Sequence, residues 1–149
     1  MNRPMSRRGD RHGFTLLELM VTITVIGILT TITVPRLAGV LRRGQEGSTR
    51  GNLGSIRSAL GIYYAETEGL YPDDALVLAA GGRFLKSFPK ALIPPHHTAS
   101  NSVSLGAGTV GINDVGGWAY SNLSSDSEFG HLWVNCTHTD SKGTAWSSF

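Results

Sequence analysis

The sequence predicts an α+β fold: a long N-terminal helix, whose first half crosses a membrane, packed on a small C-terminal antiparallel β-sheet. Three features of the 149 residues lead to this prediction. A nearly unbroken apolar stretch lies close to the N-terminus. Apolar residues then recur at helical spacing to about residue 68. Two short aromatic runs, separated by a polar turn, follow in the C-terminal part.

The apolar stretch, residues 14–34, has the length and composition of a membrane-spanning helix. It reads FTLLELMVTITVIGILTTITV, and Glu18 is its single charged side chain. Its 21 residues match the roughly 20 that a helix needs to cross about 30 Å of hydrocarbon. Four arginines lie among residues 1–13. They predict a single pass with the N-terminus in the cytoplasm and the C-terminal part exported.

Charge is unevenly distributed along the chain. The formal net charge is +2, but residues 1–13 hold four of the 13 basic residues and one of the 11 acidic residues. Without them, nine basic residues face ten acidic ones. No cluster of Lys and Arg interleaved with aromatic residues follows, so the sequence predicts no nucleic-acid partner. The single cysteine, Cys136, excludes an intrachain disulfide.

Beyond the apolar stretch, the helical pattern continues. Pro35 closes the apolar run, and a proline inside a helix removes a hydrogen bond and usually kinks the helix. Further on, an apolar stripe at helical spacing is formed by Leu53, Ile56, Leu60 and either Tyr63 or Tyr64. Five glycines from residue 39 to residue 54 each cost about 1 kcal/mol relative to Ala in a helix. We therefore expect low helix stability, or partial melting, in that segment.

The C-terminal part is polar and rich in small residues. Residues 117–121 (GWAYS) and 131–135 (HLWVN) are the strand candidates, and the polar segment between them indicates a hairpin. Residues 96–116 are expected to be irregular. The tail, residues 137–149, is expected either to add an edge strand or to pack its aromatic side chains on the sheet.

The segment Gly13-Phe14-Thr15-Leu16-Leu17-Glu18 resembles the cleavage and methylation motif of type IV pilins and type II secretion pseudopilins. The resemblance implies that a membrane-embedded aspartyl peptidase cuts after Gly13 and methylates the new amine of Phe14. It also places the family's acid, five residues into the processed chain, at Glu18. The family's proline at the end of the apolar span corresponds to Pro35. The motif covers about residues 9–36, and the remainder resembles the family in architecture.

The chemistry of these positions agrees with the resemblance. A glycine before the cut lets a peptidase approach the backbone without a side-chain clash. A charge deep in a bilayer costs on the order of 3 kcal/mol, so Glu18 needs a partner. Cleavage supplies one, because the Phe14 amine of a neighbouring subunit would pair with Glu18 and fix the axial register of a filament. The alternative is that Glu18 extends its carboxylate to the nearby membrane surface.

The resemblance further implies three segments and a set of partners. Residues 1–13 are a cleaved basic leader, residues 14–35 the transmembrane and filament-core helix, and residues 36–149 the helix continuation and exported globular head. The chain would be a structural filament subunit, with no enzymatic activity and no cofactor. Its partners would be a prepilin peptidase and methyltransferase, other copies of itself in a helical filament, and an inner-membrane assembly platform driven by a cytoplasmic ATPase. It would sit in the inner membrane before assembly and in a periplasmic or cell-surface filament afterwards.

Metal ligands are present but poorly patterned. The residues from which a zinc site would be built are His96, His97, His131, Cys136 and His138. Cys136-x-His138 is not a standard zinc spacing, so surface histidines and a buried thiol are the favoured interpretation. Asp126, Glu128 and Asp140 are weak calcium candidates, because they lack an Asp-x-Asp-x-Asp-Gly pattern and would have to converge in space. The sequence therefore predicts no metal site.

The subfamily stays open. Major secretion pseudopilins carry an Asp-Pro-Trp-Gly-like segment and an Asp-rich calcium loop, whereas residues 89–95 here read PKALIPP and no acid-rich loop follows. Many pilins close a C-terminal loop with a disulfide, which one cysteine forbids. A pilin or pilin-like subunit is the main hypothesis, and a pseudopilin or a low-abundance tip subunit that binds a ligand is the alternative. An anchored enzyme is disfavoured, since the sequence has neither Gly-x-Ser-x-Gly nor a phosphate-binding loop.

Overall fold

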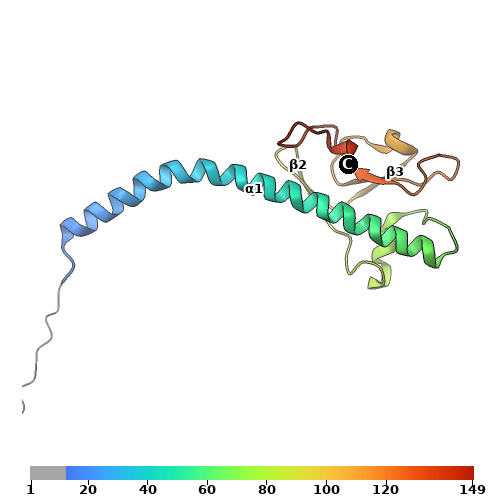
Figure 1. The fold of residues 1–149 in the computed structure, drawn as a ribbon, viewed down its shortest axis with the longest axis horizontal. Coiled ribbons are helices and arrows are strands. Elements are labelled where there is room, and N and C mark those ends of the chain that lie inside the picture. The colour runs from blue at the N-terminus through green and yellow to red at the C-terminus, as the bar shows by residue number, and fades with distance from the viewer. Residues whose placement is uncertain (1–12) are drawn as a thin grey trace, which may run out of the picture. The chain divides into compact units, whose positions relative to one another are not determined.

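The computed structural model describes residues 13–149 (Figure 1). Of the predicted leader, residues 1–13, only Gly13 lies within the described part. The chain separates into two compact units, one ending at Ala38 and the other comprising Gly39–Phe149. The three segments proposed from the sequence, with limits at residues 13 and 35, remain a prediction.

The first element is the helix α1, Leu16–Glu66, which has 51 residues and contains Pro35. It begins after Thr15, whose side-chain Oγ1 accepts the backbone N–H of Glu18 at 3.2 Å in an N-cap arrangement. The threonines of the apolar stretch donate their hydroxyls to carbonyls three or four residues earlier, at 2.7–2.9 Å in Thr22, Thr24, Thr30, Thr31 and Thr33. These bonds satisfy the hydroxyls inside an apolar helix. The predicted long helix is confirmed, and its glycine-rich segment is helical throughout.

The remaining elements are short. In chain order they are the 3-10 helix η1 (Ala75–Gly82), β1 (Ala91–Ile93), β2 (His97–Ser100), β3 (Val103–Gly106), η2 (Gly108–Gly111), β4 (Trp118–Ser121), β5 (Leu132–Val134) and η3 (Trp146–Ser148). Strands β1 and β2 form an antiparallel pair, and β3, β4 and β5 form a second sheet in that order. Both sheets, the 3-10 helices and the C-terminal half of α1 belong to the head (Figure 1).

The predicted hairpin is confirmed by the antiparallel pair β4–β5, in which Trp118 faces Val134 and Tyr120 faces Leu132. The α+β class is also confirmed, with one difference in the sheet. Strand β3 lies beside β4 in parallel, with Val103 opposite Trp118. The expectation that residues 96–116 are irregular was wrong, because β2, β3 and η2 lie there. These strands are short and rich in small polar residues, so they lack the alternation that marks a strand in sequence.

The head core joins the second half of α1 to the sheet. Leu53, Ile56 and Leu60 are buried against residues of the strands, in a cluster that includes Trp118 and Leu132. The apolar stripe read from the sequence is thus confirmed. Tyr63, rather than the exposed Tyr64, continues it by packing against this cluster.

The C-terminal tail packs its aromatic side chains instead of adding a strand. Trp146 is fully buried in the core, and Phe149 packs against it with 5.7 Å between the ring centroids. Strand-like pairing within the tail is limited to an isolated bridge between Thr139 and Ala145. The second of the two alternatives for the tail is therefore the correct one.

Candidate functional site

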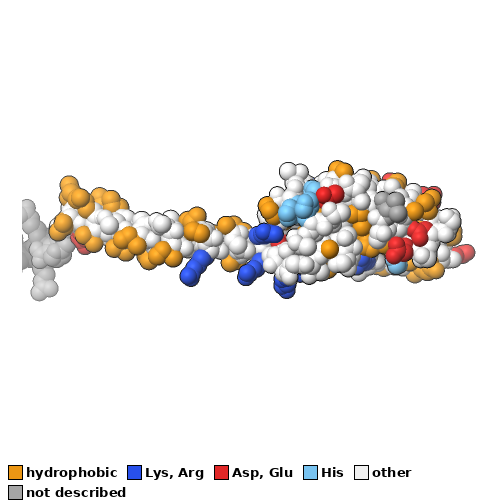
Figure 2. All heavy atoms as spheres, turned by 90° about the horizontal axis from the view of Figure 1, so that it is seen from above, with side chains coloured by type: hydrophobic (Ala, Val, Ile, Leu, Met, Phe, Trp, Pro, Cys, Tyr) orange, Lys and Arg blue, Asp and Glu red, His pale blue; other side chains and the backbone are white. Residues whose placement is uncertain are grey.

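The N-terminal part of α1 presents an apolar surface with no cover from its own chain. Every described residue from Gly13 to Leu41 is exposed, and Leu16, Ile26 and Val34 keep 76%, 61% and 58% of their surface accessible. Hydrophobic side chains follow the visible face of this segment in Figure 2. Its most apolar window has a mean hydropathy of 2.0, and by length and composition the helix is able to cross a membrane. Because exposed apolar surface of this extent is unfavourable in water, lipid or other protein must cover it.

Glu18 lies in the first turn of this helix, on the exposed surface. Within residues 13–149, no hydrogen bond or ion pair is formed by its carboxylate. Its backbone N–H is satisfied by Thr15. The spacing Thr15-x-x-Glu18 is that of a capping box, a pattern typical of a helix start. Glu18 thus combines a local role at the helix start with a charge available to another molecule.

Gly13 and Phe14 precede the helix. Both lie outside regular secondary structure, and a side chain added at Gly13 would meet no atom within 4 Å. Pro35, which the sequence also predicts to take part in assembly, lies inside α1 and is exposed. The peptide bond between Gly13 and Phe14 is consequently accessible and not tied into the helix.

The calcium candidates do not come together. Asp140 is buried and forms an ion pair with Arg50 of α1, while its Oδ1 accepts the N–H groups of Lys142 and Thr144 at 2.8 and 2.9 Å. Burial opposes ionisation of Asp140, but these two N–H groups and Arg50 together hold its pKa below the ordinary value. Among residues 13–149, no group of three metal ligands includes Asp126, Glu128 or Asp140. Asp140 therefore has a structural role in fixing the tail to α1.

A different set of potential ligands does converge. His97, Asp114, Cys136 and His138 place one ligand atom each within 4.8 Å of all the others. Three of these residues, His97, Cys136 and His138, were candidates from the sequence, where unrelated surface histidines and a buried thiol were the favoured interpretation, and Asp114 was not among the candidates. The only sign of this cluster in the local sequence is Cys136-x-His138. Asp114 and His97 are distant in sequence and come close to this pair only in the folded chain.

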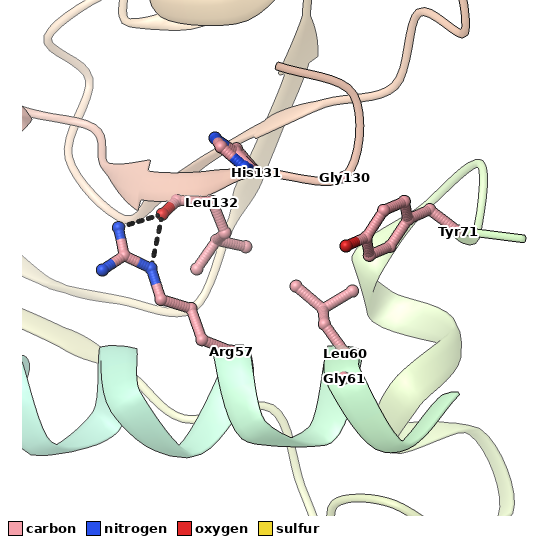
Figure 3. Close-up of a pocket in the computed structure, with 7 residues that line it drawn as sticks. All are labelled: Arg57, Leu60, Gly61, Tyr71, Gly130, His131 and Leu132. Carbon is pink, nitrogen blue, oxygen red and sulfur yellow. Dashed lines mark hydrogen bonds between the residues drawn. The ribbon is translucent and has the colours of Figure 1, made fainter. Parts of the chain in front are cut away.

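A surface pocket of about 390 Å³ lies between α1 and the β4–β5 hairpin (Figure 3). The Arg57 guanidinium enters it and donates to the Leu132 carbonyl at 3.2 and 2.8 Å and to the Phe149 carbonyl at 2.7 Å. Partial burial lowers the pKa of Arg57. Tyr71 and His131 also line the pocket. Because the guanidinium already binds backbone carbonyls, Arg57 joins the helix to the hairpin and is not free for a ligand.

An exposed apolar helix that is able to cross a membrane by length and composition thus precedes a head with a core of its own. A family model described as the prokaryotic N-terminal methylation motif matches residues 8–34. A type II secretion system core protein G of Klebsiella michiganensis is 39% identical over 57 residues, 38% of this chain and 40% of the relative. The fimbrial protein EcpC of Eikenella corrodens is 32% identical over 81 residues, 52% of each chain.

A third relative is the type IV narrow pilus major component PilA5 of Thermus thermophilus, 34% identical over 58 residues, 39% of this chain and 50% of the relative. The chain thus spans about half or less of the length of these relatives. No solved structure matches it. The methylation motif over residues 8–34 and these partial matches show that the chain is similar in its N-terminal part to type IV pilins and type II secretion pseudopilins.

Proposed function

We propose that the chain is a structural subunit of a type IV pilus or a related filament, polymerised through its N-terminal helix. One observation carries this proposal: the helix that bears the methylation motif exposes its apolar side chains from residue 14 to residue 41, while the head buries a core of its own. Such a helix inserts into a bilayer first. In a filament it exchanges contacts with lipid for contacts with the same helix of other copies.

Processing at the Gly13–Phe14 bond would link membrane insertion to assembly. The bond precedes the helix, where the backbone is accessible to a membrane-embedded peptidase. Cleavage releases the positive leader and creates an amine on Phe14, which a methyltransferase then modifies. The Glu18 carboxylate of a neighbouring copy pairs with that amine, so an unprocessed chain lacks the partner that sets the register. An inner-membrane platform driven by a cytoplasmic ATPase would extract the processed subunits.

Mass spectrometry of filaments sheared from the cell surface tests this proposal. The expected result is an abundant chain that begins at N-methylated Phe14. A Gly13→Val variant should retain the leader and yield no filament, whereas a Gly27→Val control, altered within the helix, should be cleaved normally. A Gly13→Val chain of normal processed mass would refute the cleavage site. Surface material without this chain would refute the pilus subunit.

A secretion pseudopilin is the second candidate, favoured by the similarity to core protein G of a type II secretion system. Deleting the chain separates the two functions. Loss of long surface fibres with normal export of folded proteins indicates a pilin. Loss of export with fibres retained indicates a pseudopilin. A low-abundance tip subunit predicts that fibres persist, built of another protein, with this chain present in trace amounts.

A further inference from the structure

We propose that His97, Asp114, Cys136 and His138 bind one zinc ion in the head. The inference does not depend on filament assembly, because all four residues belong to the unit Gly39–Phe149. Histidine side chains gather at one place on the visible face of the globular part in Figure 2. The side chains of His97, Asp114 and His138 keep 14%, 34% and 41% of their surface exposed, so an ion can enter from solvent.

Three of the six separations between the ligand atoms have the lengths expected around a tetrahedral zinc ion, and all six are within 4.8 Å. The Asp114 Oδ1 atom lies 3.3 Å from His97 Nε2 and 3.4 Å from His138 Nδ1. The Cys136 Sγ atom lies 3.5 Å from His138 Nδ1. Zinc bonds of roughly 2.0–2.3 Å at tetrahedral angles place neighbouring ligand atoms about 3.3–3.6 Å apart. The two nitrogen–oxygen separations are longer than the ordinary hydrogen-bond distance of about 2.9 Å, and they suit a shared ion better than direct bonds.

The backbone around the cluster is firmly held. Asn135, which is buried, accepts the N–H groups of Asn113 and Asp114 on its Oδ1 at 2.9 and 3.1 Å. The Thr137 N–H donates to Asp114 Oδ1 at 2.8 Å. That bond, with the nearby His138 and His97, holds the pKa of Asp114 below its usual range although burial opposes it. These contacts fix the Asp114 carboxylate and orient it toward both imidazoles, as supporting partners do at metal sites.

A glycine brings the first histidine into place. Gly116 has a φ of +83°, and a Cβ atom there would lie 3.0 Å from the Cβ of His97. A larger residue would be strained by that backbone conformation and would also push His97 away from the cluster. Close approach of β2 to the loop before β4 therefore depends on this position.

The donor set favours zinc over calcium and magnesium. One thiolate, two imidazoles and one carboxylate are ligands that zinc accepts, whereas calcium and magnesium require mostly oxygen ligands. Burial raises the pKa of Cys136 to about 11, so the thiol is protonated without metal. On binding, the sulfur–zinc bond replaces the S–H bond, the proton passes to solvent and the ion loses its water ligands. No oxidation or reduction takes place.

Four protein ligands close the coordination shell, as in structural zinc sites. They come from three places in the chain: the start of β2, the loop before β4 and the segment after β5. Zinc would therefore cross-link the head in the way that a disulfide does in proteins with paired cysteines. A bound ion stabilises the folded state in proportion to the logarithm of its concentration over the dissociation constant.

The test uses the full-length protein in detergent, prepared metal-free under reducing, anaerobic conditions. Titration with zinc chloride should saturate at one ion per chain and raise the unfolding temperature. Cobalt chloride should give thiolate-to-cobalt charge-transfer absorption together with the visible bands of a tetrahedral ion. Calcium chloride should change neither. Absence of saturable zinc binding, or an equal response to calcium, would overturn the proposal.

Variants locate the ion. Cys136→Ser should abolish the charge-transfer band, and the partly exposed His138→Ala should weaken binding at least about 100-fold, since losing an outer partner alone costs about 10–100-fold. His96 stacks on His138 with 4.0 Å between ring centroids but is outside the cluster, and His131 is exposed elsewhere. His96→Ala and His131→Ala should bind zinc like the unaltered chain. If either control lost binding as His138→Ala does, or if His138→Ala kept it while folded by circular dichroism, the four-ligand site would be refuted.

Discussion

At the scale of single residues, buried or unpaired polar groups determine what this chain does. Glu18 is a charge in an apolar helix and is not neutralised within residues 13–149, while Asp140 is a buried charge with a complete set of partners. The Glu18 carboxylate is therefore available for contacts between molecules, whereas Asp140 stabilises the fold of a single chain. Tyr120 also stabilises the fold of a single chain, because its buried hydroxyl donates to the Pro72 carbonyl at 2.6 Å.

Replacing Glu18 with Gln or Ala should leave membrane insertion and cleavage intact but reduce filament yield severely, because the Phe14 amine of the neighbouring copy then lacks its counter-charge. Immunoblots of sheared and membrane fractions measure both properties. A Glu68→Gln variant, which removes an acid just beyond the end of α1 instead, is the control and should assemble. Normal yield from Glu18→Ala would contradict the register role.

Asp140→Ala should destabilise the head by about 3 kcal/mol, since it leaves two N–H groups and the Arg50 guanidinium without their acceptor. Asp140→Asn keeps an acceptor for the N–H groups and removes only the charge, so its loss should be smaller. Urea denaturation of the two variants separates these contributions. Equal losses from both would show that the ion pair with Arg50 carries the whole effect.

Because the Tyr120 hydroxyl is buried, we expect the free energy of unfolding to decrease at alkaline pH. Burial raises its pKa above the ordinary value of about 10, so the folded chain keeps the proton while the unfolded chain releases it. Stability from this group is complete below about pH 10 and falls as the pH rises further. Tyr120→Phe should be less stable at neutral pH by about 1–2 kcal/mol, since the Pro72 carbonyl loses its donor. It should also lose less stability in alkali than the unaltered chain, as thermal unfolding at several pH values would show.

At the scale of elements, α1 has two faces in the head. One buries Leu53, Ile56 and Leu60, and the other exposes glycines. A Cβ atom added at Gly51 or Gly54 would meet nothing within 4 Å. The packing of the head therefore does not require these glycines, although they lower the intrinsic stability of the helix.

Gly51→Ala and Gly54→Ala should each stabilise the head by about 0.5–1 kcal/mol, because alanine loses less chain entropy on forming a helix. Gly69→Ala is the control, for which we expect a loss of stability instead of a gain. Gly69 has a φ of +93°, so alanine there should cost about 1–2 kcal/mol. Urea midpoints of the three variants test the signs. Destabilisation by Gly51→Ala would mean that the exposed glycines are needed within the single chain.

At the scale of the whole molecule, the core of the head and the apolar helical surface are separate. The core cluster runs from Leu53 to Trp146, entirely within Gly39–Phe149. Of the described residues, none from 13 to 38 belongs to this core. Folding of the head and association through the helix should consequently be separable.

A fragment comprising residues 39–149 should fold cooperatively and remain monomeric without detergent, whereas a chain beginning at Phe14 should require detergent or assemble. The reason is that the fragment retains the complete core and lacks most of the exposed apolar surface. Sedimentation and thermal unfolding check both statements. A fragment that fails to unfold cooperatively would show that the N-terminal helix contributes to the stability of the head.

The sequence by itself determined the parts of this protein that depend on neighbouring residues. The apolar stretch, the buried stripe of α1 and the β4–β5 hairpin were predicted, because each is a local pattern of apolar and polar residues. The methylation motif was identified by its resemblance to that of known prepilins. For the residue that continues the buried stripe, the sequence left two adjacent candidates, Tyr63 and Tyr64, and the structure identifies Tyr63.

Only the tertiary structure decided which distant residues meet. Arg50 and Asp140 lie 90 positions apart in the chain, and no spacing links them. The same holds for Asp114, which reaches His97 and His138 through the loop before β4. It holds too for β3, whose place beside β4 is set by pairing and not by its own polar residues. Such contacts join residues that are far apart in the sequence. The packing of the whole core determines which of these residues meet.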